Sequence, residues 1–490
     1  MSDNNSQLLQ ATTEDEIVDS SQLLQAFFIS LAWAFDAQQT FVSVFTDAQP
    51  SWHCTNSTLI CTATTCTLPA ESWTWDYPKH TSIISEWDLE CSSTAMAGLP
   101  ASAYFVGCLV GGFLLAPLAD SWFGRKKVLF LTTLIMSLSG VFTAVSPNVW
   151  IYSALRFICG FARSTVAPTA LVLASEIVGK RWRDRVSIIG FFCFTFGFLS
   201  LAVIAYIAGE LSWRVLYLFI SIPCVFYSVL VYFVTPESPR WLLVRGRREE
   251  ALETLENMEV SNWNRSISSM VGVEEEWSNG DVFSALRMLL EKKWALRRLA
   301  LVMITGFGIG MSYYGMPLGV GNLGSNIYFS VAINALAELP AALITFVLIE
   351  RLNRRSLLGV FTSISGVCSI LCVFMEGRWR MAAEVVSFFS ACTACNVVLI
   401  YSLELFPTSV RNLALSMVRQ AVVFGGAWVP MLVVAGRKEV GGGVTFAVFG
   451  IVIGCCGLLV CCLPETRGGK ITDTLEEEEC KQIRALVNKA

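Results

Sequence analysis

Apolar runs of about 20 residues recur along the whole chain, and no other feature constrains its fold as strongly. Each run is long enough to cross the roughly 30 Å of hydrocarbon in a bilayer as an α-helix. We count about twelve runs, at 23–47, 94–117, 128–146, 149–173, 186–208, 212–234, 299–318, 327–349, 357–375, 381–403, 412–435 and 443–463. The sequence therefore predicts an all-α membrane protein with twelve transmembrane helices.

The composition agrees with this class and excludes others. Hydrophobic residues make up 54% of the 490 residues and charged residues 15%, against about 25% charged in ordinary soluble domains. A formal net charge of −4 gives no basic footprint for nucleic acid. We therefore expect a lipid bilayer around the chain and no nucleic-acid partner.

Two long polar segments, at about 48–93 and 235–298, interrupt the apolar runs, and the second divides them six and six. The predicted parts are a cytosolic N-terminus (1–22), a six-helix bundle (23–234) with an outer loop (48–93), a cytosolic linker with amphipathic helices (235–298), a second six-helix bundle (299–463) and a cytosolic tail (464–490).

The orientation follows from Lys and Arg in the short loops, which favour the cytosolic side. Basic clusters lie at 125–127, 180–185 and 351–355, and the opposite loops carry fewer bases. Both termini are therefore predicted to face the cytosol. The plasma membrane and the vacuolar membrane are the candidate locations.

The outer loop contains cysteines and a glycosylation sequon, which are typical of a segment in an oxidising compartment. Four of the seventeen cysteines lie there, namely Cys54, Cys61, Cys66 and Cys91. Four cysteines allow two disulfides in three connectivities, and such bonds persist outside the cytosol. Asn56 begins a glycosylation sequon in the same loop. We therefore expect a glycoprotein. Both histidines also lie in this loop, but their spacing is not that of a metal site, so we expect no metal.

Charged clusters recur in the two halves at an offset of 228 to 230 residues. Glu404 follows Glu176 by 228 residues, and Glu465 follows Glu237 by 228. The repeated members are Asp120, Gly124 and Arg125 after the second span, Glu350, Arg351 and Arg354 after the eighth, Glu176 and Arg183 after the fourth, and Glu404 and Arg411 after the tenth. Such duplication is typical of transporters built from two related bundles.

These clusters predict a conformational gate on the cytosolic side. Acids and bases at facing helix ends can pair across the two bundles and break when that side opens. The alternative is that the basic residues only fix the orientation. We favour the gate because acids stand among the bases at repeated positions, and only Lys and Arg count for orientation.

Several motifs carry a resemblance to a known family. They are Pro236–Leu242 (PESPRWL), Glu404–Thr408 (ELFPT), Phe35–Phe41 (FDAQQTF) and the large outer loop with four cysteines. In these the chain resembles the major facilitator superfamily and, within it, the plant organic cation/carnitine transporters. The resemblance implies two six-helix bundles and transport by alternating access.

Charged groups inside the predicted spans are candidates for the functional site, because a charge at the bilayer centre costs about 2.5–3.5 kcal/mol or more. Glu338 lies near the middle of the eighth span and is the first candidate. Asp36 in the first span could serve the cavity or a bond between helices. Arg419 in the eleventh span could face the cavity or extend to the cytosolic interface.

The resemblance adds Tyr313 and Tyr328, which match aromatic positions that line the cavity in this family. Aromatic faces bind quaternary ammonium groups by cation–π attraction. The animal cation transporters have Asp at a position in the eleventh span that is Val423 here. A zwitterion suits these residues, with Glu338 and the tyrosines at its ammonium group and Arg419 at its carboxylate.

Four further charged residues lie near the outer ends of spans. They are Arg156, Glu210, Arg214 and Glu384, and we expect interfacial anchoring or pairing for them. Gly107 and Gly111 in the second span predict close helix packing.

The sequence thus predicts a transporter of organic cations or zwitterions such as carnitine, with H+ or Na+ as the candidate coupling ion in symport and no cofactor. The nearest alternative is a sugar–proton symporter, although sugar sites need several amides and spans seven and eight offer only Asn326 and Asn334. A transporter-like solute receptor is a second alternative. An enzyme is not expected, because no metal set, nucleophile dyad or cofactor loop is present.

Overall fold

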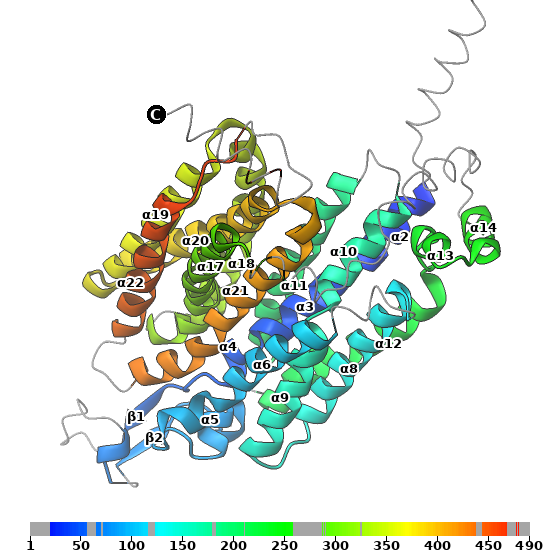
Figure 1. Ribbon diagram of the computed structural model, residues 1–490. Coiled ribbons are helices and arrows are strands. Elements are labelled where there is room, and N and C mark those ends of the chain that lie inside the picture. The colour runs from blue at the N-terminus through cyan, green and yellow to red at the C-terminus, as the bar shows by residue number, and fades with distance from the viewer. Residues whose placement is uncertain are drawn as a thin grey trace, which may run out of the picture.

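The structure is a computed structural model of the chain. It describes residues 20–55, 65–69, 72–115, 123–178, 183–209, 211–257, 287, 289, 291–323, 326–437, 443–467, 477 and 479. Nearly all of the described residues are helical (Figure 1).

The first half of the chain forms one bundle. Its first helix consists of three segments, α2 (Ser20–Ser30), α3 (Ala32–Phe41) and α4 (Ser43–Thr46). Leu31 and Val42 between them keep right-handed helical dihedrals, so the segments follow one another as a single rod. The other helices are α6 (Thr94–Leu114), α8 (Arg125–Thr143), α9 (Val149–Arg163), α10 (Val166–Ile177), α11 (Arg183–Ile207) and α12 (Trp213–Val234).

The second half forms the other bundle. Its helices are α17 (Lys293–Gly319), α18 (Ile327–Arg351), α19 (Arg354–Phe374), α20 (Gly377–Leu405), α21 (Thr408–Arg437) and α22 (Val444–Leu458), with 3₁₀ turns η5 (Val320–Leu323) and η6 (Leu459–Cys462). Figure 1 shows the two halves of the chain side by side.

Eleven helices in the described part of the chain are long and apolar enough to cross a membrane. The twelfth predicted span, at 23–47, is the segmented rod α2–α4, of which each piece alone is too short to qualify. Several helices are longer than predicted. α17 begins at Lys293 rather than 299, and α20 begins at Gly377 rather than 381, because apolar runs mark the hydrocarbon and not the helix ends.

The segment predicted as an outer loop contains regular structure. It holds β1 (Trp52–Cys54), η1 (Thr65–Thr67), β2 (Trp73–Trp75), η2 (Lys79–Thr81) and α5 (Ile83–Glu86). The two strands pair antiparallel with Trp52 opposite Trp75. We name this end of the molecule the strand end, and the opposite end, where α2 begins and α12 ends, the basic end (Figure 1).

A disulfide joins Cys66 to Cys91 in this segment. Cys54 is also disulfide-bonded, and its partner lies outside the described residues. Cys61 and the sequon residue Asn56 lie outside them as well. In the predicted linker 235–298, the structure describes two helices at its start, α13 (Pro239–Val244) and α14 (Arg248–Asn257).

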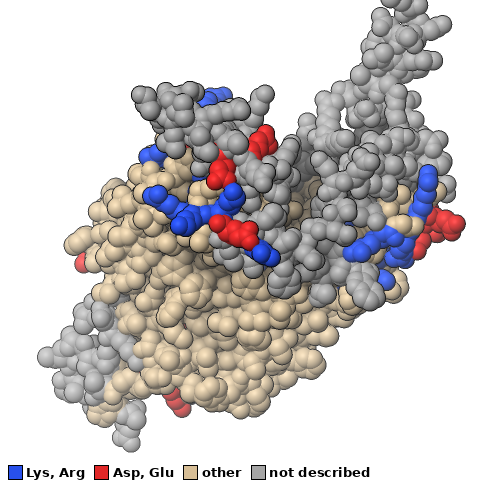
Figure 2. Space-filling view, viewed as in Figure 1, with Lys and Arg blue, Asp and Glu red and all other residues tan. Residues whose placement is uncertain are grey.

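Charge is distributed as a membrane protein requires. On the face shown in Figure 2, Lys and Arg gather at the basic end, and the broad middle of the molecule carries uncharged residues. Large apolar side chains are exposed on the helices, for example Phe226, Phe233 and Phe374 at 72–78%. Hydrocarbon covers such side chains at no cost, whereas water would not.

Close helix packing inside the first bundle depends on glycine. A Cβ at Gly107 of α6 would lie 2.1 Å from the carbonyl oxygen of Phe157 on α9, and a Cβ at Gly160 of α9 would lie 1.9 Å from the carbonyl oxygen of Tyr104. The predicted packing role of Gly107 is therefore confirmed, since only a residue without a side chain lets these backbones approach.

We expect Gly107→Ala to destabilise the protein by about 1–3 kcal/mol, because α6 and α9 have to separate to admit the methyl group. Gly359→Ala on α19 is the matched control: its Cβ would meet nothing within 4 Å, and a helix favours Ala by roughly 0.5–1 kcal/mol. Thermal unfolding of the purified variants in detergent measures both effects. Equal melting temperatures for the two variants would contradict the packing argument.

Candidate functional site

A buried ion pair joins two helices of the first bundle at its centre. Arg163, in the last turn of α9, donates from Nε to Asp36 Oδ1 at 2.5 Å and from Nη2 to Oδ2 at 2.9 Å. Asp36 on α3 is 1% exposed. This two-bond arrangement is the strongest geometry for such a pair. Of the two roles that the sequence left open for Asp36, the structure has the bond between helices.

The second bundle reaches this ion pair through an aromatic side chain. Tyr314 of α17 interacts electrostatically with Arg163, and its ring lies 4.8 Å from that of Phe105 on α6. Tyr104, also on α6, interacts with Arg163 as well. The centre of the molecule is therefore built from both bundles.

Arg419 of α21 lies beside the same cluster without a partner of its own. It interacts electrostatically with Arg163 and Asp36, and it makes no hydrogen bond or ion pair with any residue that the structure describes. The side chain is nevertheless exposed, although it lies about 17 Å along α21. Its guanidinium is therefore accessible to solvent or to a ligand.

Glu338 lies on α18 and is buried. The hydroxyl of Tyr313 on α17 donates to Glu338 Oε1 at 2.7 Å, and Oε2 has no partner among the described residues. Phe388 of α20 stacks on Tyr313 with ring centroids 6.0 Å apart. Cys395 of α20 interacts with both Glu338 and Arg419. An acid and a base from different helices thus face one region.

Tyr328 does not join this group. Its ring stacks on Phe45 at 5.5 Å and meets Tyr206 edge-on at 5.7 Å, and both partners belong to the first bundle. Close by, Arg437 donates to the carbonyl oxygen of Asp47 at 3.1 Å. These contacts link the two bundles at the strand end, so Tyr328 belongs to their closure there.

At the basic end, the repeated acids cap repeated helices. Glu237 Oε1 accepts hydrogen bonds from the backbone N–H groups of Arg125 and Lys126, and Glu465 accepts them from Arg354 and Arg355. Burial raises the pKa of Glu237, opposed by these backbone donors, which lower it. Gly124, with φ +79°, lets α8 begin against Glu237, because a positive φ favours glycine.

The ion pairs at this end join helices within one bundle. Arg125 lies 3.6 Å from Glu176, and Arg354 lies 3.0 Å from Glu404. The gate was predicted to pair across the bundles, and these described pairs instead lie within them. Arg351 is exposed and Arg411 donates to the carbonyl oxygen of Phe406. Asp120 and the side chains of Arg183 and Glu350 lie outside the described part of the chain.

Two of the charged groups assigned to outer span ends lie inside a bundle instead. Arg156 is fully buried, and its guanidinium lies 4.2 Å from the ring centre of Tyr104. Glu384 is fully buried and accepts a hydrogen bond from Asn334. Arg214 does pair, with Glu86 at 2.5 Å. Glu210 lies outside the described residues.

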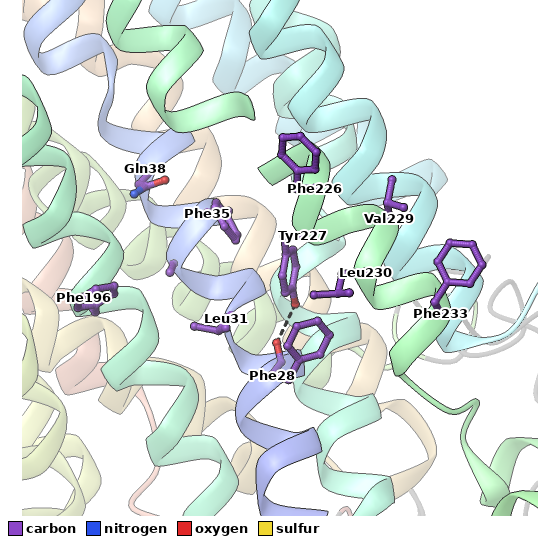
Figure 3. Close-up of a pocket in the computed structure, with 11 residues that line it drawn as sticks. Phe28, Leu31, Phe35, Gln38, Phe196, Phe226, Tyr227, Val229, Leu230 and Phe233 are labelled. Atoms are coloured by element: carbon purple, nitrogen blue, oxygen red, sulfur yellow. Dashed lines mark hydrogen bonds between the residues drawn. The ribbon is translucent and has the colours of Figure 1, made fainter. Parts of the chain in front are cut away.

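A separate apolar cavity of about 630 Å³ lies between α2, α3, α11 and α12 (Figure 3). Figure 3 shows rings from α2, α3, α11 and α12 around it, and Gln38 at one edge. The amide of Gln38 donates to Ser200 at 2.8 Å. No charged side chain lines this cavity. We therefore take the charged residues around Arg419, and not this cavity, as the candidate functional site.

Sequence reasoning missed Arg163, Tyr314, Cys395 and Phe388. Arg163 could have been found, since it lies about 21 Å along a predicted span and an intramembrane charge is a functional candidate. Nothing in the sequence distinguishes Phe388 or Cys395 from other apolar residues.

We expect Asp36→Asn to destabilise the protein by about 3–5 kcal/mol, because it leaves Arg163 buried without a counter-charge. The double variant Asp36→Asn, Arg163→Gln removes both charges and should recover part of that loss. A double-mutant cycle of thermal unfolding measures this coupling. Additive losses in the cycle would mean that the two side chains do not stabilise one another.

Comparisons with known proteins place the chain. Residues 39–477 match the family described as "Sugar (and other) transporter". The organic cation/carnitine transporter 2 of Arabidopsis thaliana is 49% identical over 95% of this chain and 92% of its own length. The organic cation/carnitine transporter 3 of that plant is 50% identical over 94% and 91%.

Solved structures agree on the fold. The xylose transporter of E. coli in its inward-open conformation superimposes with a TM-score of 0.69 at 16% identity, over 93% of this chain and 98% of that protein. The predicted twelve-helix transporter architecture is therefore confirmed. The chain belongs to the organic cation/carnitine transporter family of the major facilitator superfamily.

Proposed function

We propose that this protein carries zwitterions of the carnitine class, and smaller organic cations, across a membrane by alternating access. Two relatives that are 49% and 50% identical are named organic cation/carnitine transporters. Carnitine bears a quaternary ammonium group at one end and a carboxylate at the other. A site for it needs an anionic and aromatic region and, at a short distance, a cation.

The exposed, unpartnered guanidinium of Arg419 is the observation that carries this proposal. A charge within a transmembrane span is a functional-site candidate, and a substrate carboxylate would supply the counter-charge that Arg419 lacks among the described residues. Glu338 and Tyr313 lie across Cys395 from it and would take the ammonium group. Asp36 is already paired with Arg163 and is not assigned to the substrate.

The alternatives fit this site less well. A sugar offers only hydroxyl groups and leaves Arg419 without a counter-charge. A solute receptor would have no need for two bundles with repeated caps at Glu237 and Glu465. A role in transport, rather than an enzymatic one, is supported by the matching transporter family and by relatives that are named transporters.

The coupling and the orientation are further parts of the proposal. Glu338, with one oxygen free among the described residues, is the group best suited to exchange a proton or Na+ with the substrate cation. The basic end, where Lys and Arg gather (Figure 2), would face the cytosol. The strand end would then face outside or the vacuolar lumen and carry a glycan on Asn56.

Uptake into proteoliposomes tests the function directly. We expect labelled carnitine to accumulate in exchange for internal carnitine, choline to be carried more weakly, and xylose not to be carried. Repeating the assay with and without a pH gradient and with and without Na+ identifies the coupling ion. Uptake of sugars without uptake of carnitine would refute the proposal.

Glu338→Gln keeps the size of the side chain and removes its charge. We expect the affinity for carnitine and for choline to fall at least about tenfold, since loss of a desolvated charge pair costs about 2–5 kcal/mol. Equilibrium binding of both ligands to the purified protein measures this. If both bind as tightly as to the wild type and only the response to a pH gradient is lost, Glu338 serves coupling and the ammonium group binds elsewhere.

Arg419→Gln separates zwitterions from cations. We expect it to weaken carnitine binding about tenfold or more, because the carboxylate loses its counter-charge, and to leave choline binding unchanged. Arg411→Gln, on the same helix but bonded to Phe406 near its end, is the control and should affect neither ligand. An equal loss for carnitine and choline would show that Arg419 supports the structure and not the carboxylate.

A further inference from the structure

A second buried acid, Glu384, is bonded to Asn334, which lies one helical turn from Glu338 on α18 toward the strand end. This acid has no part in the proposed function. Glu384 of α20 and Asn334 of α18 are both 0% exposed. Asn334 Nδ2 donates to Glu384 Oε1 at 2.9 Å. Both residues lie about 10 Å along their helices, and these two helices run in the same direction, so the pair connects them at matching heights.

The pair leaves two oxygens without a donor. Asn334 Oδ1 and Glu384 Oε2 are both buried, and neither has a partner among the described residues. Leaving such a buried acceptor unpaired is unfavourable. A proton on Oε2 removes both deficits at once. The carboxylic acid then donates its O–H to Asn334 Oδ1, while the amide donates its N–H to Oε1, and the two side chains close a ring.

No ion pair with Glu384 is found among the described residues. The titratable groups that interact with Glu384 are Cys372 of α19 and Cys392 of α20, and neither supplies a positive charge. Arg380 on the same helix interacts with Cys372. In the part of the chain that the structure describes, α17, α18 and α21 bring no Lys or Arg into an ion pair with Glu384. An ionised carboxylate in this position would be a bare charge inside the hydrocarbon layer.

We propose that Glu384 binds a proton, and that the closed acid–amide pair with Asn334 positions Glu338. Asn334 precedes Glu338 by four residues on α18, so both lie on one face of that helix. Glu384 precedes Phe388 by four on α20, and Phe388 stacks on Tyr313, which donates to Glu338. The pair therefore fixes how α18 and α20 lie against each other one turn from the substrate acid.

The expected effect on substrate binding rests on the proposed role of Glu338. The assignment of a proton to Glu384 does not depend on that role. As the pH rises, loss of the proton leaves a bare carboxylate, so the protonated pair stabilises the fold at neutral pH and this stabilisation disappears at alkaline pH. Glu384→Gln cannot ionise, and its amide can both accept from Asn334 Nδ2 and donate to Oδ1. This variant should behave as a permanently protonated form.

Infrared spectroscopy of the protein in lipid tests the proton. In a Glu338→Gln background, which removes the buried acid of α18, we expect a protonated-carboxyl C=O band at neutral pH that shifts in heavy water and disappears on alkaline titration. Glu384→Gln should remove this band, and Glu376→Gln, an exposed acid preceding the same helix, should not. A spectrum without the band at neutral pH would overturn the proposal, and this result needs no variant at position 384.

Thermal unfolding and binding as a function of pH test the positioning. We expect the wild type to lose melting temperature at alkaline pH, and its carnitine affinity to fall about fivefold or more, while Glu384→Gln stays within about twofold of its neutral value. Asn334→Leu should weaken binding at every pH. Identical pH profiles for the wild type and Glu384→Gln would overturn the proposal. If the melting temperature depends on pH and the carnitine affinity does not, the proton on Glu384 is supported and the proposed positioning of Glu338 is wrong.

Discussion

Charges inside the hydrocarbon layer have to be neutralised, and the pair of Asp36 with Arg163 does this at the centre of the molecule. It ties α3 to α9, and its guanidinium also meets Tyr314 from the other bundle. Arg419 lies beside the pair and has no described partner, so the cluster of Asp36, Arg163 and Arg419 carries one positive charge in excess. An anionic group on the substrate is the natural complement to that excess.

The described contacts join the two bundles to each other at the strand end and join helices within one bundle at the basic end. At the strand end, Phe45 stacks on Tyr328 and Arg437 donates to the carbonyl oxygen of Asp47, so side chains of both bundles meet. At the basic end, the described ion pairs Arg125–Glu176 and Arg354–Glu404 each stay inside one bundle. Separation of the bundles at the basic end therefore breaks neither pair. The repeated acids stiffen each bundle as a unit, which rigid-body rocking requires.

The sequence predicts the helices well and the site in part. Apolar runs, basic loops and the repeat reveal twelve spans and two bundles, because hydrophobic length and charge position act locally. Glu338 and Arg419 are also found, because a charge within a span is conspicuous, and Tyr313 is found through the family resemblance. Partners are not found: that Asp36 bonds Arg163, or that Glu384 faces Asn334, depends on how helices far apart in the sequence pack. Tyr328 was assigned to the cavity by family resemblance, and its packing on Phe45 could not be read from one chain.

The central claim is that the excess positive charge beside Arg419 selects a substrate with a carboxylate. Competition between carnitine and its methyl ester for the unmodified protein tests this most directly, because the ester keeps the ammonium group and the shape but carries no negative charge. The account predicts that carnitine binds at least about tenfold more tightly than the ester. Equal affinities, or tighter binding of the ester, would contradict it.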